Sequence, residues 1–202
     1  YGFYFTTEDG GANWTAQSSP LTDLGMHLNR IVALGDGSLL IVGERGLVAH
    51  STDRGANWRV LRSPYIGSFF GALPYGERGA LVYGLRGNLY ALDDVQKLAS
   101  ATPAELEGWI EREPLDEPAA AALGWRHLEN SVRESLFGGL WLAPGQALLV
   151  GVNGVARRVD LAAGKVTALE SPADESLSAV LPVKGRLLAV GRRGVQDLGA
   201  QP

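Results

Sequence analysis

Residues 39–58, LLIVGERGLVAHSTDRGANW, contain the pattern that decides the fold. The apolar run 39–42 and the alternating residues 47–50 are typical of two β-strands. Gly43 and Gly46 give the segment between these strands the backbone freedom that a tight turn needs. The stretch therefore predicts a β-hairpin that leads directly into the turn STDRGANW.

This acidic turn has the pattern Ser/Thr-x-Asp-x-Gly-x-Asn-Trp. The Asp53 carboxylate can accept backbone N–H bonds inside the turn, and Gly55 can take a positive φ. We expect Trp58 to pack its ring over the apolar face of the hairpin. The same pattern ends residues 2–14, which align with residues 46–58 without a gap. The shared positions are Thr7, Asp9, Gly11 and Trp14 in the first copy, and Ser51, Asp53, Gly55 and Trp58 in the second.

The Gly-x-x-Gly turn itself recurs at 84–87, 151–154 and 191–194, each time after an apolar run. The first glycines of successive turns are 41, 67 and 40 residues apart. A period of roughly 40–45 residues, with about four short strands per unit, is typical of β-propeller blades. Glycine makes up 27 of 202 residues, about twice the usual frequency of roughly 7%, as turn-dense β proteins require. The sequence predicts an all-β fold, a propeller of four-stranded blades forming a single domain over 1–202.

Three whole blades and two partial ones can be read along the chain. Residues 1–19 supply only the second half of a blade, and the last blade ends without a fourth strand. An open arc exposes unpaired strand edges, so we expect the chain to be the C-terminal part of a longer, closed propeller. The expected strands after the first half-blade are 30–34, 39–42, 47–51, 58–62, 69–73, 81–83, 89–92, 125–129, 136–142, 148–150, 155–161, 166–170, 177–181, 187–190 and 195–198.

The long spacing in the repeat implies an insertion at 94–124, which replaces the acidic turn of its blade. Thr102, Pro103 and Glu105 form a capping box with proline at the first helical position, so a short helix is expected over 103–112. The Pro-, Ala- and acid-rich stretch 113–122 is expected to be a loop. The insertion is either a partner-contacting element or a tolerated surface addition. Three tryptophans lie outside the acidic turns: Trp125 and Trp141 are expected in the core, and Trp109 in the core or at a contact.

Composition excludes several classes of function. A net charge of −4 argues against a general nucleic-acid binder, and no apolar run is long enough to insert into a membrane. The absence of cysteine excludes disulfides and thiol chemistry. His27, His50 and His127 are far apart, so no metal site is expected. No catalytic motif is present, and we predict no catalytic residue and no cofactor.

The third residue of each Gly-x-x-Gly turn is the candidate for partner binding. These residues are Arg45, Arg86, Asn153 and Arg193, and Arg192 adds a further charge in the last turn. Equivalent positions of a propeller face the same way, so the arginines are expected to form an arc on one rim. Guanidinium groups make bidentate contacts with carboxylates, which suits an anionic partner surface. In the alternative interpretation, the arginines only pair with nearby acids such as Glu44 or Glu77.

The two acidic turns resemble the BNR/Asp-box repeats of bacterial neuraminidases. The combination GERGLVAHSTDRGANW is more similar to the photosystem II stability/assembly factor family of β-propellers, which also has members in non-photosynthetic bacteria. The match is strong over 39–62 and 2–14, and rests elsewhere on the Gly-x-x-Gly turns alone. At 160–164 the box is reduced to DLAAG, without the tryptophan.

This resemblance implies a non-enzymatic scaffold that binds a protein partner, a membrane complex or one of its subunits, during assembly. It implies a basic docking patch and an extracytoplasmic location; no signal peptide is visible in this chain. It also implies that the Asp-box residues are structural.

The rival interpretation is a sialidase-like glycoside hydrolase, since sialidases share this box and this fold and use three arginines with a Tyr–Glu pair. No Phe-Arg-Ile-Pro-like segment appears; the nearest segment, LRSP at 61–64, is only weakly similar to it. A glycan-binding propeller without hydrolytic activity is a further alternative. Fold alone does not carry function.

Overall fold

The computed structural model describes residues 2–171 and 173–200. Within them the strands form five antiparallel sheets: three of four strands, one of three and one of two. The strands are β1 (Phe5–Thr6), β2 (Thr15–Ala16), β3 (Leu28–Ala33), β4 (Leu39–Gly43), β5 (Val48–Ser51), β6 (Arg59–Val60), β7 (Phe69–Tyr75), β8 (Gly79–Gly84), β9 (Leu89–Leu92), β10 (Trp125–His127), β11 (Leu136–Ala143), β12 (Gln146–Gly151), β13 (Ala156–Asp160), β14 (Lys165–Ala168), β15 (Leu177–Val183), β16 (Arg186–Gly191) and β17 (Gly194–Ala200).

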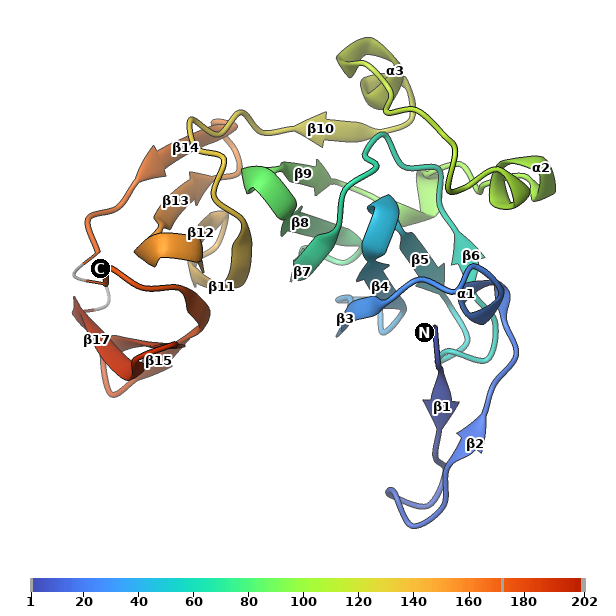
Figure 1. Ribbon diagram of the computed structural model, residues 1–202, viewed down its shortest axis with the longest axis horizontal. Helices are drawn as coiled ribbons and strands as arrows, with labels where there is room; N and C mark the ends of the chain where they lie inside the picture. The colour runs from blue at the N-terminus through green and yellow to red at the C-terminus, as the bar shows by residue number, and fades with distance from the viewer. Residues whose placement is uncertain (1, 172, 201–202) are drawn as a thin grey trace.

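The sheets are arranged as the blades of a partial β-propeller, which confirms the predicted fold class (Figure 1). In each four-stranded blade the chain runs from the inner strand outward, in the orders β3-β4-β5-β6, β7-β8-β9-β10 and β11-β12-β13-β14. The inner strands β3, β7, β11 and β15 line the concave side of the arc, and each contacts the next. The half-blade β1-β2 and the three-stranded blade β15-β16-β17 lie at its two ends.

Apolar layers between successive blades hold the arc together. Because side chains alternate along a strand, Leu40 and Val42 face the next blade and pack with Phe69. Ile41 and Leu47 face the other way, toward the half-blade. Each fully buried Leu, Ile or Val side chain contributes about 1.5–3 kcal/mol. The alternation that predicted the strands is thus also what makes each blade apolar on both faces.

The antiparallel pairing places successive turns at opposite edges of each blade. The Gly-x-x-Gly turns lie at the edge where the chain passes from one blade to the next, and we call this edge the turn face. The Asp boxes join the third and fourth strands and therefore lie at the opposite edge, the box face.

The insertion differs from its prediction in two respects. The helix α2 (Pro103–Glu107) ends at Gly108, so it is shorter than the expected helix over 103–112. The expectation of a loop over 113–122 is confirmed for 113–116 and wrong for the rest, because helix α3 (Glu117–Ala122) forms there. Asp116 caps α3 by accepting the backbone N–H of Ala119 at 2.9 Å, and the alanine run that follows favours a helix.

A third short helix, α1 (Pro20–Asp23), was also not predicted from the sequence. It forms because Ser19 and Thr22 make a capping box with proline at the helix start. The helix buries Leu21 completely, in the same apolar cluster as Trp58. It thereby ties the connection between the half-blade and β3 to the core.

The insertion passes back over the preceding blade as a strap. Backbone bonds join Ala101 to Val60 (2.9 Å) and Arg62 to Ala99 (2.9 Å), which extends that blade beyond the short strand β6. Trp109 is only 2% exposed and packs in the cluster that contains Leu21, so its role is in the core.

The other two tryptophans outside the acidic turns are both packed. Trp125 is fully enclosed between blades, stacked on Phe69. Trp141 is half-buried, and its Nε1 donates to the carbonyl of Pro74 at 2.8 Å. No helix in the described parts of the chain has both the length and the apolar character to cross a membrane.

Candidate partner-binding face

The four Gly-x-x-Gly turns are fixed by one repeated hydrogen bond. In each, the backbone N–H of the second turn residue donates to the carbonyl of the residue just before the inner strand of the same blade. The bonds are Glu44 to His27 (3.0 Å), Leu85 to Ser68 (2.8 Å), Val152 to Ser135 (2.9 Å) and Arg192 to Ser176 (3.0 Å). The turns therefore stand at the same place on each blade, along the turn face.

Glycine is required in the first three turns, and at Gly191 in the fourth, because the backbone of the connecting segment lies directly against it. A Cβ on Gly43 would collide with the carbonyl oxygen of His27, and one on Gly46 with that of Tyr65. The turns form the 3₁₀ segments η1 (Glu44–Gly46), η2 (Leu85–Gly87) and η4 (Val152–Gly154). Tight packing of the glycines leaves the third residue of each turn as the one that points outward.

That third residue has a left-handed backbone in three of the four turns, with φ of 49° at Arg45, 56° at Arg86 and 55° at Asn153. This conformation costs roughly 1–2 kcal/mol for residues other than glycine, less for asparagine. All three side chains are exposed. The turns thus hold two arginines and an asparagine at equivalent positions on one face.

The fourth turn differs from the other three. Gly191 pairs directly with Gly194, and Val190 pairs with Val195, so the turn is one residue shorter than in the other blades. Arg193 is consequently absent from the residues with positive φ within the described chain. It lies on the turn face but does not share the backbone conformation of Arg45 and Arg86.

The arginines also differ in their partners. The Arg45 guanidinium donates to the carbonyl of Ile110 in the strap at 3.0 Å. Arg193 pairs with Asp174 at 3.0 Å, and Arg192 lies 3.7 Å from Glu175. Among the described residues, Arg86 has no acid within 4.0 Å of its guanidinium.

Among the described residues, neither acid that the sequence suggested as an alternative partner forms an ion pair with an arginine. The Glu44 carboxylate lies 2.7 Å from His27, which lowers the pKa of Glu44. Glu77 belongs to the turn between β7 and β8, on the opposite edge of its blade from Arg86.

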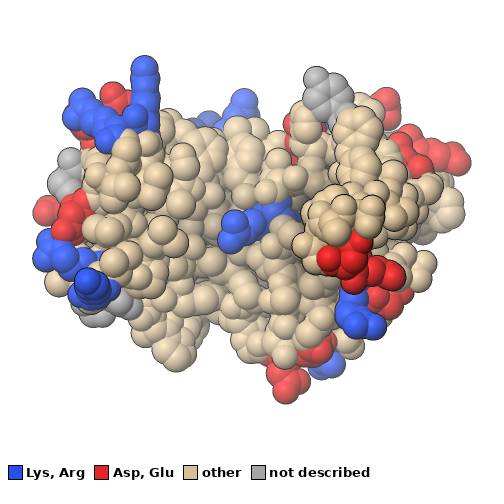
Figure 2. All heavy atoms as spheres, turned by 90° about the horizontal axis from the view of Figure 1, so that it is seen from below, with Lys and Arg blue, Asp and Glu red and all other residues tan. Residues whose placement is uncertain are grey.

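Figure 2 looks into the concave side of the arc. Basic side chains project from the upper rim at the C-terminal end and near the middle, and the surface between the rims is mostly uncharged. Acidic side chains gather mainly toward the other end. The charge distribution is therefore uneven in a chain whose net charge is −4.

Sequence reasoning missed Arg112, which fixes the strap to the turn face. Its guanidinium donates to the carbonyls of Ser63 (2.7 Å), Tyr65 (2.6 Å) and Arg45 (2.6 Å), and lies over the ring of Trp109. Burial, followed by the charge of Arg45, lowers the pKa of Arg112 to about 10. Arg112 is the one arginine of an acid-rich insertion, and this could have marked it in the sequence as a candidate.

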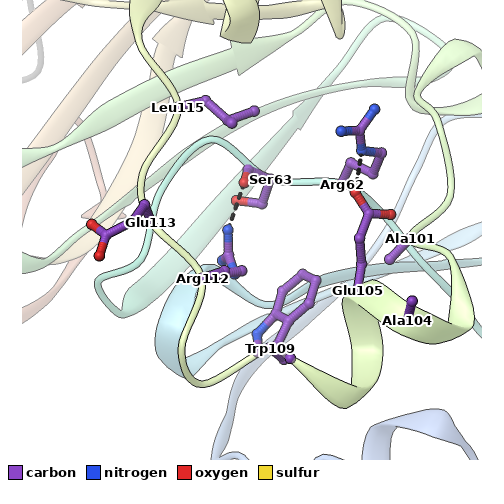
Figure 3. A pocket seen from close by; sticks show the side chains of 10 residues that line it. Arg62, Ser63, Ala101, Ala104, Glu105, Trp109, Arg112, Glu113 and Leu115 are labelled. Atoms are coloured by element: carbon purple, nitrogen blue, oxygen red, sulfur yellow. Dashed lines mark hydrogen bonds and ion pairs between the residues drawn. The ribbon is translucent and has the colours of Figure 1, made fainter.

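A pocket of about 320 Å³ lies between the strap and the preceding blade (Figure 3). Trp109 and Ala104 line one side of it, and Arg62 and Glu105 form an ion pair of 2.7 Å at another. Figure 3 shows Arg112 directed at the Ser63 carbonyl between these elements. The two cationic side chains that line this pocket, Arg62 and Arg112, already bind groups of the protein itself.

The two Asp boxes lie on the box face, away from the arginines. In the second box, Asn57 donates to Asp53 from its backbone (2.8 Å) and its side chain (2.7 Å), and Gly55 N–H donates to Ser51 Oγ (2.8 Å). The first box repeats these bonds through Thr7, Asp9, Gly11 and Asn13. Hydrogen bonds from Asn13 and Asn57 lower the pKa of Asp9 and Asp53 to about 2.

Two tyrosines of the described chain, Tyr65 and Tyr75, are half-buried and donate hydrogen bonds within the protein. Burial raises the pKa of Tyr65 to about 12, and its hydroxyl donates to the Leu85 carbonyl at 2.8 Å. Burial also raises the pKa of Tyr75, whose hydroxyl donates to Asp93 at 2.6 Å. Within the described residues, no group of three metal-ligating side chains is assembled.

No protein-family model matches the sequence, and no curated protein matches it. Among solved structures, YCF48 from Cyanidioschyzon merolae is similar in fold, with a TM-score of 0.64 at 12% identity; the match covers 100% of this chain and 64% of that one. A YCF48 bound to D1 peptide is similar at a TM-score of 0.42 and 15% identity, over 99% of this chain and 73% of that one. The tricorn protease is similar at a TM-score of 0.48 and 12% identity, over 97% and 18%.

The first of these likenesses supports the fold, and the two weaker ones add nothing to it. The chain spans only 64% of the length of that YCF48 structure.

Proposed function

We propose that this protein is a non-enzymatic scaffold that binds a protein partner through its turn face. The observation that carries the proposal is the repeated turn that holds Arg45 and Arg86 outward at equivalent positions in neighbouring blades. Arg192, Arg193 and Asn153 extend the same face. An acidic surface of the partner is the complement that such a row of guanidinium groups would recognise.

More specifically, we propose that the protein is an assembly or accessory factor for a membrane protein complex and is located outside the cytoplasm. Its support is the similarity of the stretch GERGLVAHSTDRGANW to the photosystem II stability/assembly factor family, together with the fold shared with YCF48. The partner would be a subunit of that complex.

The test is a pull-down from detergent-solubilised membranes with wild-type protein and the variant Arg45→Glu/Arg86→Glu/Arg193→Glu. The retained proteins are identified by mass spectrometry. We expect the variant to retain about tenfold less of a membrane-complex subunit than the wild type, because three attractive contacts become repulsive.

The matched control reverses three exposed cations on the box face, Arg54→Glu/Lys165→Glu/Lys184→Glu, and so changes the net charge by the same amount. It is expected to retain the partner as the wild type does. Equal loss in both variants would show a response to net charge alone, and equal retention would place binding on another surface. Release of sugar from a sialylated substrate by the wild type would instead support the hydrolase.

A further inference from the structure

Arg157, on the outer half of its blade in strand β13, is a buried cation without a counter-ion in the described part of the chain. Its side chain is only 9% exposed. One terminal nitrogen donates to the carbonyl of Ala156 at 2.8 Å, and Nε is buried without any partner. Among the described residues no carboxylate lies within 4.0 Å of the guanidinium. Burying an unpaired charge is costly, so such a group is expected to have a partner that is bound from outside.

Arg157 lines a pocket of about 310 Å³ that opens at the turn face. The pocket lies between the connections on either side of the blade, and its polar lining includes Glu134, Asn153 and Ser171. Asn153 is the residue that stands where neighbouring turns carry Arg45 and Arg86. In this blade the turn lacks a cation, and Arg157 supplies one from beneath it.

We propose that this pocket binds a carboxylate side chain of the protein partner, held by the Arg157 guanidinium beside the Asn153 amide. This inference rests on the proposed function and assigns a specific anchor within it. A carboxylate carries a single charge, which matches one guanidinium. A phosphate would bring a second negative charge next to Glu134 without a further cation in the pocket.

The test follows the Nε–Hε resonance of Arg157 by ¹⁵N NMR, assigned by its loss in Arg157→Gln. The wild type is titrated with a blocked hexaglutamate peptide, with blocked hexaglutamine, and with inorganic phosphate at equal ionic strength. We expect the resonance to move with hexaglutamate alone. Affinity for hexaglutamate should fall about tenfold in Arg157→Gln, as expected for one charged hydrogen-bonded contact.

Two further variants keep the result interpretable. Arg158→Gln removes the same charge from the next residue of β13, whose side chain points to the other side of the sheet, and should change the affinity less than twofold. Arg157→Lys retains the charge and should recover part of the affinity. The backbone amide spectrum of each variant confirms that the fold is intact.

Three outcomes would overturn the proposal. If Glu134→Gln shifts the Arg157 resonance and hexaglutamate does not, Glu134 is the counter-ion in solution. If phosphate moves the resonance as strongly as hexaglutamate, the pocket is a general anion site. If hexaglutamate binds in a manner that depends on Arg86 and leaves Arg157 unchanged, the docking face stands and this anchor fails; if the peptide does not bind at all, neither acidic recognition nor the anchor survives.

Discussion

The two Asp boxes have nearly identical hydrogen bonds and very different surroundings. The distance from the backbone nitrogen of the asparagine to the aspartate oxygen is 2.9 Å in the first box and 2.8 Å in the second. Yet Trp14 is 61% exposed, and Trp58 is 6% exposed. The second box has the half-blade packed against it, with the ring of Tyr4 edge-on to Trp58 at 6.0 Å.

This difference separates two roles within one motif. The Ser/Thr, Asp, Gly and Asn residues close the turn locally, by bonds between residues at most four positions apart. The tryptophan contributes to stability only where a neighbouring blade covers it. The box is therefore a local folding unit whose apolar residue depends on its neighbours.

The largest effect is expected at the tryptophans. Trp58→Ala should lower the free energy of unfolding by about 3–5 kcal/mol, because it leaves a cavity in the cluster with Leu21 and Ile41. Trp14→Ala should lower it by less than about 1 kcal/mol, since an exposed ring loses little burial. Urea unfolding followed by far-UV circular dichroism measures both, and similar values for the two variants would refute the separation of roles.

The aspartates should give a smaller effect that is alike in the two boxes. Asp9→Ala and Asp53→Ala each remove the bonds from an asparagine and leave turn N–H groups to water, which we expect to lower the free energy of unfolding by less than Trp58→Ala does. The same unfolding experiment applies, with Asp23→Ala, outside either box, as a control of small effect. A much larger loss of stability in Asp53→Ala than in Asp9→Ala would mean that packing also contributes to the closure of the second turn.

The smallest effect is a dependence on pH. Because the folded-state pKa of Asp9 and Asp53 is about 2, below the usual 3.8, their contribution is present above pH 3.8 and is lost as the pH falls through about 2. Carboxyl ¹³C titration should show both groups ionised at pH 3, and the stability gap between wild type and Asp53→Asn should narrow between pH 4 and 2. A gap that stays constant over this range would contradict the assigned pKa.

Periodicity made the blade architecture predictable from sequence alone. The spacing of the glycines and the alternation of residues such as Leu40 and Val42 reflect local geometry that repeats in every blade. The insertion was less predictable, because a tertiary contact determines its course: Trp109 is buried against residues from the preceding blade. The helix α3 was missed although its cap, Asp116, and the alanine run were visible.

The candidate face was predictable in part. The positions of Arg45 and Arg86 follow from the repeat, whereas the shorter fourth turn depends on the register between β16 and β17. Arg157 lies on the same face of its strand as Val155 and Val159, because side chains alternate along a strand. An arginine in this apolar pattern could have been recognised in the sequence as unusual. What the sequence could not show is that no carboxylate of the described residues lies within 4.0 Å of its guanidinium.

The strap has a consequence for the order in which the molecule folds. Strand β10 pairs with β9 only after an excursion of more than thirty residues, from Leu92 to Trp125, that runs across the neighbouring blade. Closing such a long loop is entropically unfavourable until the strap has a surface to lie on, and that surface is the blade β3-β4-β5-β6. We therefore expect the blade β3-β4-β5-β6 to form before β10 joins β9, so that these two blades are completed in chain order.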